Sequence, residues 1–181
     1  HYLESNAREV RGNIRLARAD VDGALADLTT SLELAREARD PQTLVPALLM
    51  YAAALSLVGR HPEGRVAVGE ALDILERRSQ MAGVLGIVSG FVDPDVRERV
   101  VGIVESRSGG RTKWIDAIYA GATGDSLQAA SLFEEMGALT QASGVRIHAA
   151  RRLIDERRAT EAEVELDKAL AFYRSVRATF M

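Results

Sequence analysis

A period of forty residues is the feature that most constrains the fold of this chain. From residue 19 to residue 74, small residues return on small ones and large apolar residues on large ones, forty positions later. The first set is Ala19, Ala24, Leu28, Ser31, Leu32 and Leu34, and the second is Gly59, Gly64, Val68, Ala71, Leu72 and Ile74. A fixed spacing in this range is typical of stacked supersecondary units. We therefore predict an all-α fold made of repeated helix pairs.

Helix boundaries follow from apolar spacing and from capping residues. In the first predicted helix, apolar residues return at spacings of three and four, at Leu3, Ala7, Val10, Ile14 and Ala17. Aspartate or histidine followed by proline opens later helices at 40–41, 61–62 and 93–94. These features predict one domain over residues 1–181, a helical-repeat solenoid of about ten helices. Its five antiparallel pairs are expected at about 3–38, 42–78, 81–106, 112–136 and 141–178.

The third predicted pair is less regular than the others. Gly83, Gly86 and Gly90 lie on one face if this stretch is a helix, which would let another backbone approach closely. A strand over Val84–Val88 is the competing interpretation, because this run is short and apolar. We favour the helix.

Composition excludes several classes of function. The net charge is -3, and arginines alternate with acidic residues, so there is no basic patch of the kind that binds nucleic acid. Cysteine is absent, which removes disulfides and cysteine-based metal sites and favours a cytoplasmic protein. The longest apolar run, Met81–Val92, is shorter than the ~20 residues that span a bilayer. The chain begins at His1 inside a predicted helix, which suggests a piece of a longer protein.

Four of the predicted pairs share one residue pattern. A small residue in the first helix is followed by a turn, a second small residue and a large apolar residue. The first small residues are Gly12, Ala52, Ala117 and Ala150, the second are Ala24, Gly64, Ala129 and Ala162, and the large ones are Leu28, Val68, Phe133 and Leu166. Gly59 and Gly124 occupy the turn, where Ala19 and Arg157 depart from glycine. The pattern resembles the tetratricopeptide repeat (TPR), a helix–turn–helix unit of about 34 residues.

The long helices and the forty-residue period are similar to the TPR variant of large bacterial signalling ATPases, nucleotide cyclases and transcriptional regulators. The resemblance implies a non-catalytic module that binds a protein or peptide segment, or other domains of its parent chain, through a concave groove. An alternative is a small-molecule effector-sensing domain of a transcriptional regulator or cyclase. An enzyme without short sequence motifs is a third possibility. An enclosed pocket would favour the sensor, and an open groove would favour the docking module.

The resemblance also selects groove residues, because in TPR proteins the first helices of successive pairs line the groove. These residues are Glu9, Asn13, Leu49, Ala53, Trp114, Ile118, His148 and Arg151. Leu49 and Ile118 have core packing as their alternative, and Trp114 can serve either role. For Glu9 and Arg151 the alternative is that their side chains only face solvent.

Motifs for catalysis, metal and cofactor binding are missing. No phosphate loop of the G-x-x-x-x-G-K type occurs, and residues 121–126 are interpreted as an interhelix turn. The three histidines lie in different predicted elements, so we expect no metal site. Glu134 and Glu135 are interpreted as a solvated face. TPR cochaperones hold the C-terminal carboxylate of a partner with lysine, arginine and asparagine side chains. We expect no such site here, because Glu9 occupies one of the lysine positions and Met50 one of the asparagine positions.

The C-terminal helix carries an apolar surface wider than one neighbour should cover. Ala162, Leu166, Ala169, Tyr173, Val176 and Phe180 form one stripe, and Leu170 and Phe172 widen it. Terminal repeats normally need a polar outer face. We therefore expect either further parent sequence packed there or a weak homodimer through Leu170, Phe172 and Tyr173.

Overall fold

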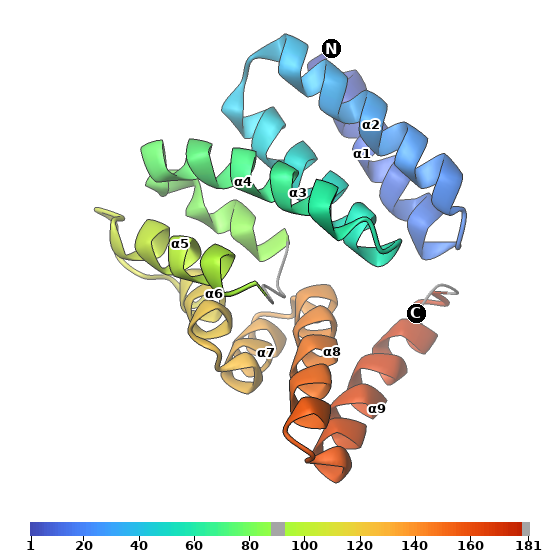
Figure 1. Ribbon diagram of the computed structural model, residues 1–181, viewed down its shortest axis with the longest axis vertical. Helices are drawn as coiled ribbons and strands as arrows, with labels where there is room; N and C mark the ends of the chain where they lie inside the picture. Colours follow the sequence, from blue (N-terminus) through green and yellow to red (C-terminus); the bar gives the residue numbers. More distant parts are fainter. Residues whose placement is uncertain (88–92, 179–181) are drawn as a thin grey trace. The chain divides into compact units, whose positions relative to one another are not determined.

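The computed structural model describes residues 1–87 and 93–178 (Figure 1). This described part contains helices and turns and no strand. The α-helices are α1 (Tyr2–Ala17), α2 (Val21–Ala38), α3 (Pro41–Leu57), α4 (His61–Arg77), α5 (Pro94–Glu105), α6 (Lys113–Thr123), α7 (Ser126–Glu135), α8 (Leu139–Asp155) and α9 (Ala159–Ser175), and η1 (Ser79–Ile87) is a 3-10 helix. The prediction of an all-α fold of about ten helices is confirmed.

The chain divides into two compact units, each of which is described by itself. In the first unit α1 packs on α2 and α3 on α4, while α2 packs on α3 and α1 also touches α3. The 3-10 helix η1 completes this unit against α3 and α4. In the second unit α5 packs on α6, α6 on α7, α7 on α8 and α8 on α9 (Figure 1). Helices adjacent in sequence are therefore packed in consecutive pairs, as a helical-repeat fold requires.

Aspartate side chains cap several of these helices. Asp20 accepts a hydrogen bond from the backbone N–H of Gly23 at 3.0 Å, and Asp93 accepts one from that of Asp95 at 3.0 Å. Asp40 caps α3 in the same way, directly before a proline in the first turn. These contacts satisfy N–H groups that have no partner within the helix. They are the reason that the aspartates mark the helix starts in the sequence.

Four interhelix turns share one backbone conformation although only two of them contain glycine. Gly59 has φ of 80° and Gly124 has φ of 97°, as expected for glycine after a helix. Ala19 and Arg157 also adopt positive φ, at 63° and 62°. Ala19 and Arg157 therefore form the same turn as the glycines. Their Cβ atoms make the left-handed backbone conformation strained.

Glycine at these two strained turns should stabilise the protein. We expect Ala19→Gly and Arg157→Gly each to raise the free energy of unfolding by about 0.5 to 1 kcal/mol, because relief of the strain exceeds the extra chain entropy of glycine. Thermal unfolding followed by circular dichroism measures the change. Gly59→Ala is the reverse control and should destabilise, although nothing lies within 4 Å of its added Cβ. An increase in stability for Gly59→Ala would contradict the conformational explanation.

Small residues allow the helices of each pair to approach closely. A Cβ atom on Gly12 of α1 would lie 2.8 Å from Leu28 Cγ and 3.3 Å from the carbonyl oxygen of Ala24, both on α2. A Cβ on Gly64 of α4 would lie 3.2 Å from the carbonyl oxygen of Ala52 on α3. The predicted small positions are therefore helix–helix contact points in both pairs.

The third predicted pair is partly wrong. Its first member is the 3-10 helix η1 rather than an α-helix, and it begins at Ser79. Ala82 and Leu85 are both fully buried, and their spacing of three residues is the period of a 3-10 helix. The strand alternative is also wrong for residues 84–87, and Gly90 lies outside the described residues. The second member is α5, as predicted.

The apolar stripe of α1 does not pack into the core. Leu3 is 78% exposed, Val10 58% and Ile14 48%, and Ala7 and Ala17 are exposed as well. The buried residues of this helix are Ser5 and Gly12. An amphipathic helix normally buries its apolar face, so α1 is an exception within the fold.

Candidate protein-binding surface

The candidate site consists of side chains on the first helices of the pairs, and we describe it for each unit separately. We call these residues the first-helix surface: Glu9 and Asn13 on α1, Ala53 on α3, Trp114 on α6, and His148 and Arg151 on α8. Each of them keeps some exposure to solvent. In the first unit α1 and α3 lie in contact, which brings Glu9, Asn13 and Ala53 onto neighbouring helices.

Two predicted groove residues belong to the core instead. Leu49 has no exposed surface, and Ile118 is 4% exposed. Both lie on helices packed on more than one side, so large apolar side chains there fill the space between neighbouring helices. The prediction that they contribute to a binding surface is wrong, and the core alternative is correct.

Glu9 and Asn13 present incompletely paired oxygen atoms on one face of α1. They are four residues apart, so their side chains lie one turn from each other. The described residues offer the Glu9 carboxylate no ion-pair partner, and its partial burial raises its pKa above the usual range. The Asn13 Oδ1 atom is buried without a hydrogen-bond partner. Because the Glu9 carboxylate is only partly buried, a ligand that supplies N–H donors would satisfy it, whereas Asn13 Oδ1 has no exposed surface for a ligand to reach.

Removing the charge of Glu9 should stabilise the free protein. A carboxyl group whose pKa is raised by folding costs stability where it is ionised, so the cost is present at pH 7 and disappears as pH falls below the unfolded value. We expect Glu9→Gln to raise the free energy of unfolding by about 0.5 to 1 kcal/mol at pH 7, as is common where a functional polar group is removed. Urea unfolding at pH 7 and pH 4 measures the change. An equal gain at both pH values would contradict a role for the charge.

Trp114, the single tryptophan, is partly exposed. Its ring meets the ring of Phe133 on α7 edge-on, with centroids 5.1 Å apart and planes at 79°. Phe133 itself is 1% exposed. Trp114 therefore packs against the core and also remains partly exposed, and tryptophans of this kind are common binding anchors.

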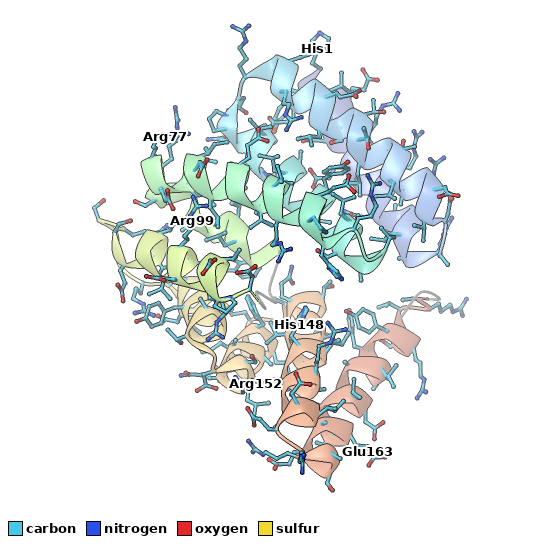
Figure 2. The ribbon with its side chains drawn as sticks, in the orientation of Figure 1. His1, Arg77, Arg99, His148, Arg152 and Glu163 are labelled. Atoms are coloured by element: carbon cyan, nitrogen blue, oxygen red, sulfur yellow. The ribbon has the colours of Figure 1, made fainter. Side chains whose placement is uncertain are left out.

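His148 and Arg151 lie near each other on α8 (Figure 2 labels His148). Burial lowers the pKa of the His148 imidazole, and the positive charge of Arg151 lowers it further. The ring is therefore neutral near pH 7, with one nitrogen that donates and one that accepts a hydrogen bond. Arg151 is exposed, and its guanidinium group is the one of the two side chains that carries a positive charge near pH 7.

A buried ionic cluster between α1 and α2 was not predicted from the sequence. Asp27 on α2 is 2% exposed, and Arg11 holds its two carboxylate oxygens with bonds of 2.7 and 2.5 Å. Arg15 adds an ion pair at 2.9 Å and Arg8 a longer one at 3.6 Å. The hydrogen bond from Arg11 lowers the pKa of Asp27, although burial opposes it. This cluster ties α1 to α2.

A second buried cluster joins three helices of the other unit. Arg146 on α8 donates to Glu165 on α9 and also to Glu134 on α7, the latter at 3.0 Å from Nε. Lys168 donates to Glu165 at 2.9 Å. Burial alone would raise the pKa of Glu165, but the hydrogen bonds from Lys168 and Arg146 lower it. Glu134 and Glu135 are both exposed, as interpreted from the sequence, and Glu134 in addition pairs with Arg146 while Glu135 pairs with Lys113.

The two clusters occupy equivalent positions in the repeat. A shift of 138 residues places Ala24 on Ala162 and Leu28 on Leu166, and the same shift places Asp27 on Glu165 and Arg8 on Arg146. An acid directly before the large apolar residue of the second helix, matched by an arginine in the first helix, was thus a detectable feature. It was missed because acidic and basic residues on helices are usually solvated.

The predicted self-association residues on α9 are only partly on the surface. Tyr173 is 7% exposed and belongs to the core, so its assignment to an interface is wrong. Leu170 and Phe172 keep intermediate exposure, and the Phe172 ring packs on Tyr173 with centroids 5.4 Å apart. Tyr173 is buried because it lies on the same face of α9 as Ala162 and Ala169, which packs on α8.

Two surface hollows lie apart from the first-helix surface. One of about 420 Å³ is lined by Pro94, Arg97, Glu98, Val101 and Ala122, and one of about 300 Å³ by Glu4, Ala7, Arg8 and Arg11. Both are open to solvent. In the first of them Arg97 donates to the carbonyl oxygen of Ala122 at 2.8 Å, which satisfies the C-terminal end of α6. Neither hollow encloses a ligand as a small-molecule pocket does.

Among residues 1–87 and 93–178, no three His, Cys, Asp or Glu side chains come together as metal ligands. The helices in these ranges are too short or too polar to cross a membrane. Comparisons of the chain with protein-family profiles, with curated proteins and with solved structures find no match.

Proposed function

We propose that this chain is a non-catalytic interaction domain of the TPR type, which binds a protein segment or another domain of its parent through the first-helix surface. The TPR assignment is supported by the recurring small and large positions and by the consecutive packing of helix pairs. A parent among bacterial signalling or regulatory proteins is proposed from the resemblance alone.

One observation carries the proposal: Glu9 is the partly buried acid that the fold leaves unpaired, while the buried acids Asp27 and Glu165 are held by arginines. Burying an acid without a partner lowers the stability of the free protein. A protein keeps such a residue where a bound ligand supplies the partner. Asn13 adds an unpaired acceptor one turn away. The open character of the two hollows supports docking of a segment over an enclosed effector.

Selection of random displayed peptides on the purified protein tests this function. We expect the selected peptides to converge on one motif for the unit that binds them. Glu9→Gln should weaken a motif bound by the first unit, and Arg151→Glu one bound by the second, at least about tenfold, a change of about 1.4 kcal/mol. Melting temperatures should stay within a few degrees of the unchanged protein. Emission of Trp114 provides a direct readout, because it is the single tryptophan.

Glu163→Gln is the matched control, since Glu163 is an exposed acid on a second helix, α9 (Figure 2). It should leave peptide binding unchanged. Peptides without a common motif, or a motif bound equally by the Glu9 and Arg151 variants, would contradict the proposed surface. Parallel loss of folding and binding in Arg151→Glu would give Arg151 a structural role.

A further inference from the structure

The exposed stripe of α1 is an apolar surface that the proposed function leaves unused. We define the α1 stripe as Leu3, Ala7, Val10, Ile14 and Ala17. All five residues are exposed, and Leu3 reaches 78%. Glu9 and Asn13 lie outside the stripe on the helix, so a partner bound at the first-helix surface would leave the stripe open. A contiguous apolar face of this kind marks an interaction site.

The repeat indicates what kind of surface covers this face. A shift of forty residues carries Ala7 onto Ala47 and Ile14 onto Ala54 of α3, which are 1% and 0% exposed. α3 packs on α2, the second helix of the pair before it, whereas no second helix precedes α1 among the described residues. In the second unit, α7 packs on α8 in the same order. Three of the five stripe residues, Leu3, Ala7 and Ile14, therefore match buried positions of α3, whereas Val10 matches Met50, of intermediate exposure, and Ala17 matches Leu57, which is 50% exposed.

The last helix carries the corresponding outer surface. The shift of 138 residues places Leu166 and Leu170 of α9 on Leu28 and Leu32 of α2, which are 1% and 5% exposed beside α3. Leu166 and Leu170 keep intermediate exposure. The end of the second unit thus presents the type of second-helix face that packs on a first helix elsewhere in the chain.

Charges beside the two faces are complementary. Arg11 and Arg18 border the α1 stripe, and both have exposed side chains. Glu163 and Asp167, also exposed, border Leu166 and Leu170 on α9. Arg11 already pairs with Asp27, and the exposed Arg174 lies one turn from Leu170. Arg18 opposite Glu163 and Asp167 is therefore the contact that favours association in one orientation.

We propose that the α1 stripe is the docking site for helix α9 of a second copy of this chain, so that copies associate head to tail. The contact is heterologous, which means that it leaves one free α1 stripe and one free α9 face after each addition. One helix face buries less area than the ~1,600 Å² of a stable interface, so the association is weak and concentration-dependent. This contact differs from the weak homodimer through the C-terminal helix that the sequence analysis expects, because it pairs α9 with α1.

Sedimentation velocity over a wide concentration range tests the proposal with two complementary variants. Val10→Glu blocks the α1 stripe and Leu170→Glu blocks the α9 face, and each should weaken self-association at least about tenfold, because a charge then enters an apolar contact. A one-to-one mixture of the two should form dimers that do not grow further, since one good face remains on each variant. The unchanged protein should instead grow beyond the dimer.

Val66→Glu is the matched control: Val66 is 73% exposed on α4, outside both faces, and this variant should associate like the unchanged protein. If Leu170→Glu fails to fold, Asp167→Arg at an exposed position takes its place. A strict monomer at all concentrations would overturn the proposal. Undiminished association of Val10→Glu, or a mixture that stays monomeric while the unchanged protein associates, would also overturn it.

Discussion

Arg146→Met is expected to lower the free energy of unfolding by about 3 kcal/mol, near the lower end of what is lost when one partner of a buried ion pair is removed. The side chains of Arg146 and Glu165 are 8% and 9% exposed, so the Glu165 carboxylate would remain buried after the change. Lys168 would still hold one of its oxygens, which limits the loss. Urea unfolding followed by circular dichroism measures the shift.

A double variant separates the buried charge from the contact itself. Arg146→Met combined with Glu165→Met should lie within about 1 kcal/mol of the unchanged protein, because apolar residues of similar size often replace a buried pair without loss. Arg151→Met makes the same change at an exposed position of α8 and should cost less than about 0.5 kcal/mol. If the double variant were as unstable as Arg146→Met, uncompensated charge would not be the cause.

Asp27→Ala is expected to lower the free energy of unfolding by about 2 to 3 kcal/mol. The carboxylate is buried and accepts charge-assisted hydrogen bonds from Arg11, each of which contributes more than a neutral one. The loss should be smaller than for Arg146, because the arginines around Asp27 are partly exposed and can be hydrated when it is removed. Glu33→Ala, at an exposed position of α2, is the control and should change stability little.

The same cluster predicts acid sensitivity. The pKa of Asp27 is lower in the folded protein than in the unfolded chain, and so is that of Glu165. Their contribution to stability is therefore fully present above the unfolded pKa values of about 4 and is lost as pH falls through the folded values. We expect Asp27→Ala to differ from the unchanged protein at pH 7 and to approach it at strongly acidic pH. A difference that persisted undiminished below pH 2 would contradict this explanation.

Most of the fold could be predicted because each helix pair is encoded locally. Small residues such as Gly12 and Gly64 mark the contact points, and Asp40 and Asp93 mark helix starts through bonds to nearby N–H groups. The 3-10 helix η1 was mistaken for an α-helix because its residues 81–87 contain no polar side chain that marks one face. Periodicity cannot separate an α-helix from a 3-10 helix in such a short run.

The binding surface was harder to predict, because position in a repeat does not determine depth of burial. Leu49 and Trp114 occupy matching places, yet Leu49 is fully buried while Trp114 keeps an exposed edge. The exposure of Val10 could not be predicted from α1 alone, since its burial depends on which helices pack against α1. Local periodicity indicates an apolar face, whereas its neighbours decide whether that face is core or interface.

Mapping of a bound peptide by backbone amide chemical shifts would test the central claim most directly. The claim is that the first-helix surface binds a protein segment, while the buried clusters at Asp27 and Arg146 only hold the fold. With the peptide obtained by selection, we expect the largest shift changes around Glu9 and Asn13 on α1, or around Trp114 and Arg151 on α6 and α8. Changes confined to the second helices α2, α4, α7 and α9 would contradict the claim.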